Sequence, residues 1–457
     1  MAGNWETQRD RVWSGQPVAE AVLTQWLADI LAECTAAQTF AETLLDSCAV
    51  RLRDIIDHID TDEYNTINRF VEAGWIELNA GVFVNPDGNF PPLIRGTAGQ
   101  TIHVRVESVE QFAKIYGLTS PIEGKAHGPA RLIRAFDGAH TCFAAYERNG
   151  HEGFGIPDVD DADIRSARLH LQTFRSRRRQ FDRIEDGLEY TEALVDSAVA
   201  AIGKHWACSL WLKSEVEYWM LRCAAGRMQK ARQDKVGIGW ANIDHHTYDG
   251  SRRHFRHTIR IFEKLGYERR EMLYAGELSG WGSQVLEQPT TGSTIFADVD
   301  LAPDELQVDF AQASLPELSK TYRAGTVSAL HGESILEAGL NHIAGLYDQQ
   351  KLRLQLHDLG FGMMSPFSDT SLLYQELTLG DWVAVDPARV DALEAIGNLG
   401  TEEAERIRTS GAILTHFENI QRNEGYKGFN KPGIDRVLRK LDPRAYHEAT
   451  LSAEAAR

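Results

Sequence analysis

The sequence predicts an α+β fold in which a βαβββ unit forms half of a barrel. Three features of residues 236–300 support this prediction. An apolar run over 236–243 ends in an Asp-His-His triplet, and an amphipathic segment over 255–265 follows with apolar residues at helical spacing. Gly266 stands where a helix C-cap is expected. Three short strand-like runs then complete the unit, at 271–274, 284–288 and 294–299.

Half a barrel leaves an apolar face open, so a second half is expected. Residues 301–386 have a weakly similar βαβββ-like pattern and could form this second half within the same chain. Alternatively, a second copy of the chain in a homodimer could supply it. The predicted organisation is an N-terminal helical region at 1–95 and a metal-binding barrel core at 96–300 that carries a helical insertion at 160–235. The additional unit at 301–386 and a C-terminal helical region at 387–457 follow.

Composition is that of a globular protein, with 43% apolar and 25% charged residues. The net charge of −18 argues against nucleic acid or an anionic membrane as the main partner. The five cysteines are scattered without a CxxC pair, and the start of the chain is polar, which is typical of a reduced, cytoplasmic protein. No apolar run approaches the roughly 18 residues of a membrane span.

Metal chemistry is predicted first at His127 and Arg131. On a strand this four-residue spacing places both side chains on one face, because side chains alternate with period two. The imidazole could hold a metal while the guanidinium holds a substrate carboxylate, which its fork fits in a bidentate manner. Pro129 would confine such a strand to an edge or a bulge. The alternative is a loop histidine beside an unrelated surface arginine.

Two further ligand candidates lie in the βαβββ unit. His245 and His246 are neighbours, so on a strand only one of them faces the barrel interior, and His245 is favoured. Glu287 follows an apolar pair on a later strand, and a carboxylate that points into a barrel needs a partner such as a metal. The alternative for Glu287 is a solvent-facing position. Two histidines and one carboxylate suit non-haem Fe(II), although other divalent metals accept the same ligands.

Other groupings of ligand-type residues are open. His331 and Glu333 form a compact pair, and His342 with Glu376 would occupy the first and a late strand of the additional unit. A four-ligand site of glyoxalase-enzyme type would then consist of His245, Glu287, His342 and Glu376. The Gly/Pro-rich segment 425–433 is expected to be a surface turn, with an active-site cover as the alternative.

On these short stretches the chain resembles the iron-dependent 2-oxoadipate dioxygenase/decarboxylase family, also called 2-hydroxyglutarate synthases, in the vicinal-oxygen-chelate superfamily. The matching stretches are His127-Gly128 with Arg131, residues 242–247 and residues 284–289. The resemblance implies that His127, His245 and Glu287 bind iron. It further implies that Arg131 holds the substrate carboxylate during catalysis and that Thr247 contacts the substrate.

The expected function is therefore a mononuclear non-haem Fe(II) dioxygenase that acts with O2 on a small 2-oxo acid or related carboxylate, with oxidative decarboxylation. One alternative is a metal-dependent lyase or isomerase of the same superfamily, which would consume no oxygen. The other is a non-catalytic protein that binds a small molecule and needs no metal. Oxygen uptake and metal content distinguish the three.

Overall fold

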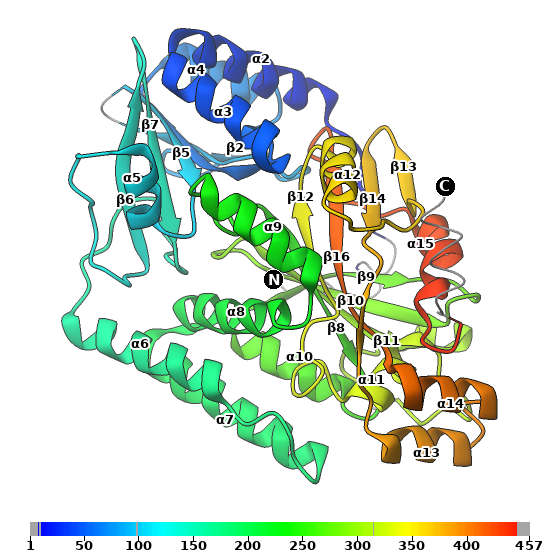
Figure 1. Ribbon diagram of the computed structural model, residues 1–457. Coiled ribbons are helices and arrows are strands. Elements are labelled where there is room, and N and C mark those ends of the chain that lie inside the picture. The colour runs from blue at the N-terminus through cyan, green and yellow to red at the C-terminus, as the bar shows by residue number, and fades with distance from the viewer. Residues whose placement is uncertain (1–7, 9–10, 97–98, 314, 446–457) are drawn as a thin grey trace.

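The computed structural model describes residues 8, 11–96, 99–313 and 315–445. It has the predicted α+β architecture: two curled sheets, each with helices packed against it (Figure 1). One sheet has seven strands, all before residue 149, and is called the N-terminal sheet below. The other has nine strands, all after residue 242, and is called the C-terminal sheet. The end of the predicted C-terminal region, residues 446–457, lies outside the described residues.

The βαβββ unit predicted around residues 236–300 is present and forms one half of the C-terminal sheet. Its elements are β8 (Ile243–Gly250), α10 (Phe255–Lys264), β9 (Glu268–Tyr274), β10 (Trp281–Gln288) and β11 (Ser293–Asp300). The first strand, β8, pairs in parallel with the last, β11, and β10 and β9 follow in antiparallel order. Helix α10 buries its apolar face against the sheet, as its helical spacing predicts.

A second unit completes the C-terminal sheet within the same chain. Its elements are β12 (His342–Leu346), α12 (Gln349–Asp358), β13 (Ser368–Thr370), β14 (Leu373–Leu377), β15 (Asp381–Val383) and β16 (Ala412–Arg422). The first strand, β12, pairs in parallel with the last, β16, and in antiparallel fashion with β8 of the first unit. The sheet therefore runs β13-β14-β16-β12-β8-β11-β10-β9, with β15 attached to β16.

The closing strand β16 lies outside the range predicted for this unit, 301–386, and inside the region predicted as helical, 387–457. Two helices, α13 (Pro387–Ala395) and α14 (Thr401–Ser410), interrupt the unit just before it. Strand β16 is almost wholly buried yet carries His416, Glu418 and Asn419. These buried polar residues remove the apolar alternation by which a strand is recognised in a sequence.

The N-terminal sheet repeats the same topology. Its first half consists of β1 (Ile56–Thr61), α4 (Tyr64–Glu72), β2 (Ile76–Asn79), β3 (Val82–Val84) and β4 (Leu93–Arg95). Its second half consists of β5 (Gln100–Arg105), α5 (Val109–Tyr116), β6 (Ala130–Asp137) and β7 (Thr141–Arg148). Strands β1 and β5 are antiparallel neighbours, and each pairs in parallel with the last strand of its own half.

The region predicted as helical at 1–95 thus contains four strands as well as helices, and a boundary at residue 96 would cut one sheet in two. Strands β2, β3 and β4 are three or four residues long, and β2 is fully exposed. Such short strands leave little periodic signal in a sequence. Helices α2 (Pro17–Glu33) and α3 (Thr35–Cys48) precede the sheet.

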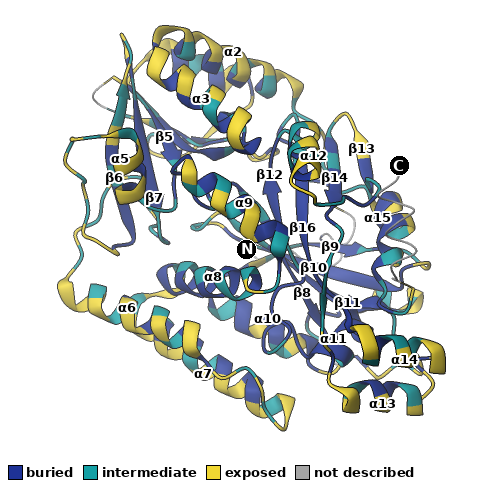
Figure 2. Cartoon of the chain, in the orientation of Figure 1, coloured by how far each residue is buried: buried dark blue, intermediate teal, exposed yellow. Residues whose placement is uncertain are grey.

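The insertion predicted at 160–235 is helical and lies between the two sheets in the chain. It comprises α6 (Asp161–Ser176), α7 (Ile184–Ile202), α8 (Lys204–Met220) and α9 (Ala224–Lys235). The remaining helices are α11 (Arg323–His331), α15 (Lys431–Leu438) and the short 3-10 turns Leu52–Ile55, Pro303–Gln307 and Arg439–Leu441. Figure 2 shows that the strands of the C-terminal sheet are mostly buried, whereas α6 and α7 expose one side.

Helix α15 packs against the inner face of the C-terminal sheet. Its Ile434, Val437 and Leu438 join Val285 and Phe296 in one buried apolar cluster. Burying such side chains contributes about 1.5–3 kcal/mol each. Within the described parts of the chain, no helix combines the length and the apolar character that crossing a bilayer requires.

Candidate metal centre

Three side chains of the types that ligate metals converge on the inner face of the C-terminal sheet. His245 lies on β8, His342 on β12 and Glu418 on β16. Glu418 Oε2 is 3.2 Å from His245 Nε2 and 3.1 Å from His342 Nε2. One potential ligand atom from each residue lies within 4.8 Å of those of the other two. Among the residues that the structure describes, these three form a group of His, Cys, Asp or Glu side chains close enough to hold one metal ion.

The strand register explains why the three side chains meet. Ala344 of β12 is the direct partner of His245 on one side and of Glu418 on the other. Direct partners point to the same face of a sheet, and His342 lies two residues before Ala344, so it shares this face. Because the alanine side chain is small, the two longer side chains can lean over it toward each other. The antiparallel joint between β12 and β8 therefore builds the site.

Each histidine is held through its second ring nitrogen. His245 Nδ1 donates to Asp244 Oδ2 at 2.8 Å, and His342 Nδ1 lies 3.0 Å from Asn341 Oδ1. A ligating histidine commonly donates its other N–H to an oxygen, which fixes the ring orientation and leaves the remaining nitrogen for the metal. In both residues here, the remaining nitrogen is Nε2, the atom that faces Glu418.

The carboxylate and Thr247 complete the hydrogen bonding at the site. Gln375 of β14 donates through Nε2 to Glu418 Oε1 at 2.9 Å, which leaves Oε2 toward the histidines. Thr247 Oγ1 lies 2.9 Å from His342 Nε2. Thr247, expected from the sequence to contact substrate, is therefore beside the candidate metal position.

Electrostatics favour the deprotonated carboxylate. Burial works against ionisation of Glu418, but the charge of His245 and the hydrogen bonds from both histidines lower its pKa to about 2. Burial likewise opposes protonation of His245, but Glu418 and Asp244 raise its pKa to about 9. For His342 burial prevails and lowers the pKa. The metal-free site thus pairs one carboxylate with one imidazolium, a charge that a cation could replace.

His127 and Arg131 lie elsewhere, on the N-terminal sheet. His127 is exposed in the turn before β6 and has a positive φ of 66°. Arg131 is buried on β6, where its Nη1 contacts Glu110 at 2.5 Å and Glu147 at 3.4 Å. The structure therefore does not bring these two residues together with His245, and protein carboxylates already occupy the guanidinium of Arg131.

Glu287 is on the same sheet as the three ligands but outside their group. It lies near the end of β10, half-buried, with Oε1 3.9 Å from Lys427 Nζ. In a βαβββ unit the first strand pairs with the last, so β10 is one strand too far from β8. His246 faces the opposite side of β8 from His245. Of the two adjacent histidines, His245 is therefore the one that belongs to the group with His342 and Glu418.

Of the other groupings, only His342 joins the site. Glu376 points away from it and binds Arg353, Gln349 and Asn419. His331 and Glu333 are both buried and belong to no such group among the described residues. Sequence reasoning missed Glu418. The alternation of His416 and Glu418 with Phe417 and Asn419 was the available signal, and it needed β16 to be recognised as a strand.

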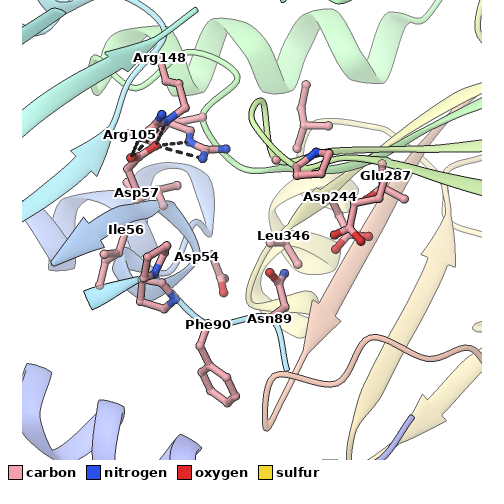
Figure 3. A pocket seen from close by; sticks show the side chains of 18 of the residues that line it. Asp54, Ile56, Asp57, Asn89, Phe90, Arg105, Arg148, Asp244, Glu287 and Leu346 are labelled. Carbon is pink, nitrogen blue, oxygen red and sulfur yellow. Dashed lines mark hydrogen bonds and ion pairs between the residues drawn. The ribbon is translucent and has the colours of Figure 1, made fainter. Parts of the chain in front are cut away.

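A cavity of about 290 Å³ lies between the two sheets and reaches the ligand-bearing side of the C-terminal sheet. Figure 3 shows Asp57, Arg105 and Arg148 of the N-terminal sheet on one side and Asp244 and Glu287 on the other. Its lining carries six cationic residues, Arg53, Arg105, Arg148, Arg270, Arg422 and Lys427, and five acidic ones, Asp54, Asp57, Glu152, Asp244 and Glu287. In a chain with a net charge of −18 this near balance makes the cavity less acidic than the chain as a whole, so it does not exclude an anionic ligand.

Two aromatic rings separate the cavity from the histidines. Phe296 of β11 lines the cavity, and its ring centroid is 4.4 Å from that of His245. Phe429, in the loop after β16, packs edge-on against Phe296 at 5.0 Å. The Gly/Pro-rich segment 425–433, expected to be a surface turn, contributes Gly425 and Lys427 to the cavity lining and packs Phe429 on Phe296.

No family model matches the sequence, and no curated protein matches it. Solved structures similar to the chain include a mutant of 4-hydroxymandelate synthase from Streptomyces coelicolor, with 12% identity and a TM-score of 0.29 over 74% of this chain and 95% of that one. Hydroxyglutarate synthase from Oryza sativa, in complex with 2-oxoadipate, is 13% identical with a TM-score of 0.28 over 67% and 100% of the two chains. Methylmalonyl-CoA epimerase from Mycobacterium tuberculosis is 11% identical with a TM-score of 0.22 over 40% and 88%. At these scores the likenesses carry no argument about activity.

Proposed function

We propose that the chain is a mononuclear non-haem Fe(II) dioxygenase that acts on a small 2-oxo acid or related carboxylate, with oxidative decarboxylation. The observation that carries this proposal is the group of His245, His342 and Glu418. Two histidines and one carboxylate form the ligand set typical of non-haem Fe(II) oxygenases, which leaves positions open for a chelating substrate. Other divalent metals accept these ligands too, so the metal itself is part of the proposal.

In this proposal the ligand set differs from the one the resemblance implied. His245 keeps its role, while His342 and Glu418 take the places expected for His127 and Glu287. Arg131 has no role at the site, because it is paired with Glu110 and Glu147 on the other sheet.

When bound, the metal would supply the redox chemistry of the reaction with O2. The surrounding residues have separate roles. Asp244 and Asn341 orient the two imidazoles, and Gln375 orients Glu418. Phe296 and Phe429 keep water away from the ligands. Arg270 and Lys427 line the cavity and attract an anionic substrate toward the site.

The test is to purify the untagged protein without oxygen or chelators and to measure its metal content, then oxygen uptake and CO2 release with a panel of 2-oxo acids. His342→Ala and Glu418→Gln are the variants, and His127→Ala is the matched control. The proposal expects about one iron per chain in the wild type and in the control, and oxygen uptake that both site variants lose. Bound metal with turnover that needs no oxygen would establish the lyase or isomerase alternative. Absence of metal after Fe(II) is added would leave the binding-protein alternative.

A further inference from the structure

Arg422, at the end of β16, connects the metal site to the loop above it. Its Nε and Nη2 donate to Asp244 at 2.7 and 3.1 Å, and Asp244 in turn accepts from His245 Nδ1. Its Nη1 donates to the carbonyl oxygens of Tyr426 and Gly428, both at 3.1 Å. One buried guanidinium therefore binds the partner of a proposed ligand and the backbone of residues 423–430, called the cover loop below.

The cover loop returns to the same histidine by a second path. Phe429 packs on Phe296, and Phe296 packs on the His245 ring. The loop also reaches the N-terminal sheet region, because Asn89 N donates to Gly425 O at 2.7 Å. Lys427 projects into the cavity with its side chain 19% exposed. Hydrogen bonds and ring packing thus connect the loop to His245 by two separate paths.

The N-terminal sheet contains a counterpart of this arrangement without a third ligand. On β1, His58 Nδ1 donates to Asp57 at 2.8 Å, and Arg148 at the end of β7 donates to the same carboxylate at 2.6 Å. His58 stacks on His103 of the adjacent first strand β5, with ring centroids 3.9 Å apart. No carboxylate joins these histidines in a metal-capable group within the described chain. The same series of Arg–Asp–His contacts therefore occurs twice: once at the proposed metal site and once in the N-terminal sheet, away from that site.

We propose that Arg422 is a positioning residue that couples the cover loop to His245, so that metal binding orders the loop and release of the loop weakens metal binding. This inference rests on the proposed metal site. An outer partner of a ligating histidine typically changes metal affinity 10–100-fold on mutation. Arg422 acts one step further out than Asp244, because it contacts Asp244 and not His245 itself. Its guanidinium also holds the loop backbone at Tyr426 and Gly428.

The experiment measures Co(II) affinity by titration of its ligand-field absorption and the hydrogen exchange of peptides that cover 423–430, with and without Co(II). The variants are Arg422→Gln and Arg422→Lys, and the matched control is Arg148→Gln. The wild type is expected to slow exchange in the cover loop when the metal binds. Arg422→Gln is expected to lower affinity by about 10-fold or more and to lose the metal-dependent protection even at saturating Co(II). Arg148→Gln is expected to keep both.

Arg422→Lys keeps the charge but cannot bind Asp244 and two carbonyls at once, so it should lose the protection and part of the affinity, with a value between those of the wild type and Arg422→Gln. Thermal melting shows whether each variant folds. If Arg422→Gln does not fold, Arg422→Lys still tests the inference. Equal affinity and equal protection in the wild type and in both Arg422 variants would overturn the inference while leaving the metal site intact. A wild type that binds no metal would overturn the metal site and the inference together.

Discussion

Glu418 Oε2 lies 3.2 Å from His245 Nε2, although β12 separates the two strands that carry them. The side chains can meet because Ala344, the residue between them in the register, has a side chain of one carbon. This contact joins the first strand of one βαβββ unit to the last strand of the other. Neither unit alone holds a complete ligand set.

Replacement of His342 by alanine is expected to abolish metal binding. One of three ligands is lost, so affinity should fall by more than the roughly 100-fold that loss of an outer partner causes. Isothermal titration with Fe(II) under nitrogen, or with Co(II) in air, measures the change. His127→Ala and Glu287→Gln serve as controls and should bind metal as the wild type does. Loss of metal in either control, with retention in His342→Ala, would return the site to the residues that the resemblance implied.

Phe429→Ala is expected to speed removal of the bound metal by a chelator. Phe429 covers Phe296, which lies on His245, so its loss opens a path from the cavity to the ligands. Stopped-flow mixing of the Co(II) protein with EDTA gives the rate. Phe361, a half-buried phenylalanine outside this contact, provides the control as Phe361→Ala. Identical release rates in the wild type and Phe429→Ala would show that the loop does not limit access.

Glu215→Gln is expected to lower the free energy of unfolding by about 3–5 kcal/mol, the usual cost of breaking a fully buried ion pair. Glu215 Oε1 lies 2.8 Å from Arg177 and 2.6 Å from Arg179, and the side chains of Glu215 and Arg177 are 0% exposed. Urea denaturation measures the loss. Glu217 on the same helix pairs with Arg175 at the surface, so Glu217→Gln should cost only about 0–1 kcal/mol. A loss of similar size in both variants would contradict the expectation.

Asp298→Asn is expected to flatten the dependence of stability on pH. Burial, helped by the neighbouring Asp249 and opposed by Arg323, raises the pKa of Asp298 to about 7. Between the unfolded value of about 3.9 and that pKa, the folded state holds a proton that the unfolded state has lost. Stability therefore falls as pH rises through this window.

The measurement is urea unfolding at about pH 5 and about pH 8, below and above the raised pKa, for the wild type and Asp298→Asn. The wild type should lose stability between the two conditions, and the variant should lose less. Asp369→Asn, which removes an exposed carboxylate, shows the effect of a charge change alone. A variant as pH-dependent as the wild type would assign the effect to other groups.

Local patterns predicted most of the first βαβββ unit. Helix α10 buries one regular face, and the three strand-like runs fall within β9, β10 and β11. The apolar run 236–243 does not form the first strand: residues 236–242 form turns and bends, and β8 begins at Ile243. Strand alternation showed that only one of His245 and His246 can face inward, and the resemblance favoured His245. His342 was a rival ligand as the first-strand residue of the additional unit, paired with Glu376 on a late strand.

Strands β1, β2 and β4 of the N-terminal sheet and strand β16 escaped prediction for different reasons. The short strands β2 to β4 offer too few residues for a period to appear. Strand β16 hides its period because the side facing inward is polar at His416 and Glu418. A buried polar strand is stable only when its groups find partners, and those partners lie on β8, β12 and β14.

The sequence by itself determined the α+β class and most of the first βαβββ unit, because these follow from periodicity within a few residues of each other, and the resemblance pointed to one member of the candidate metal group, His245. Only the tertiary structure decided that His342 and Glu418 complete the group and that Arg131 is paired with Glu110 and Glu147. The physical reason is that a ligand set depends on which strands are neighbours and in what register. Strand pairing and register are set by packing between residues far apart in the sequence, so local sequence patterns do not reveal them.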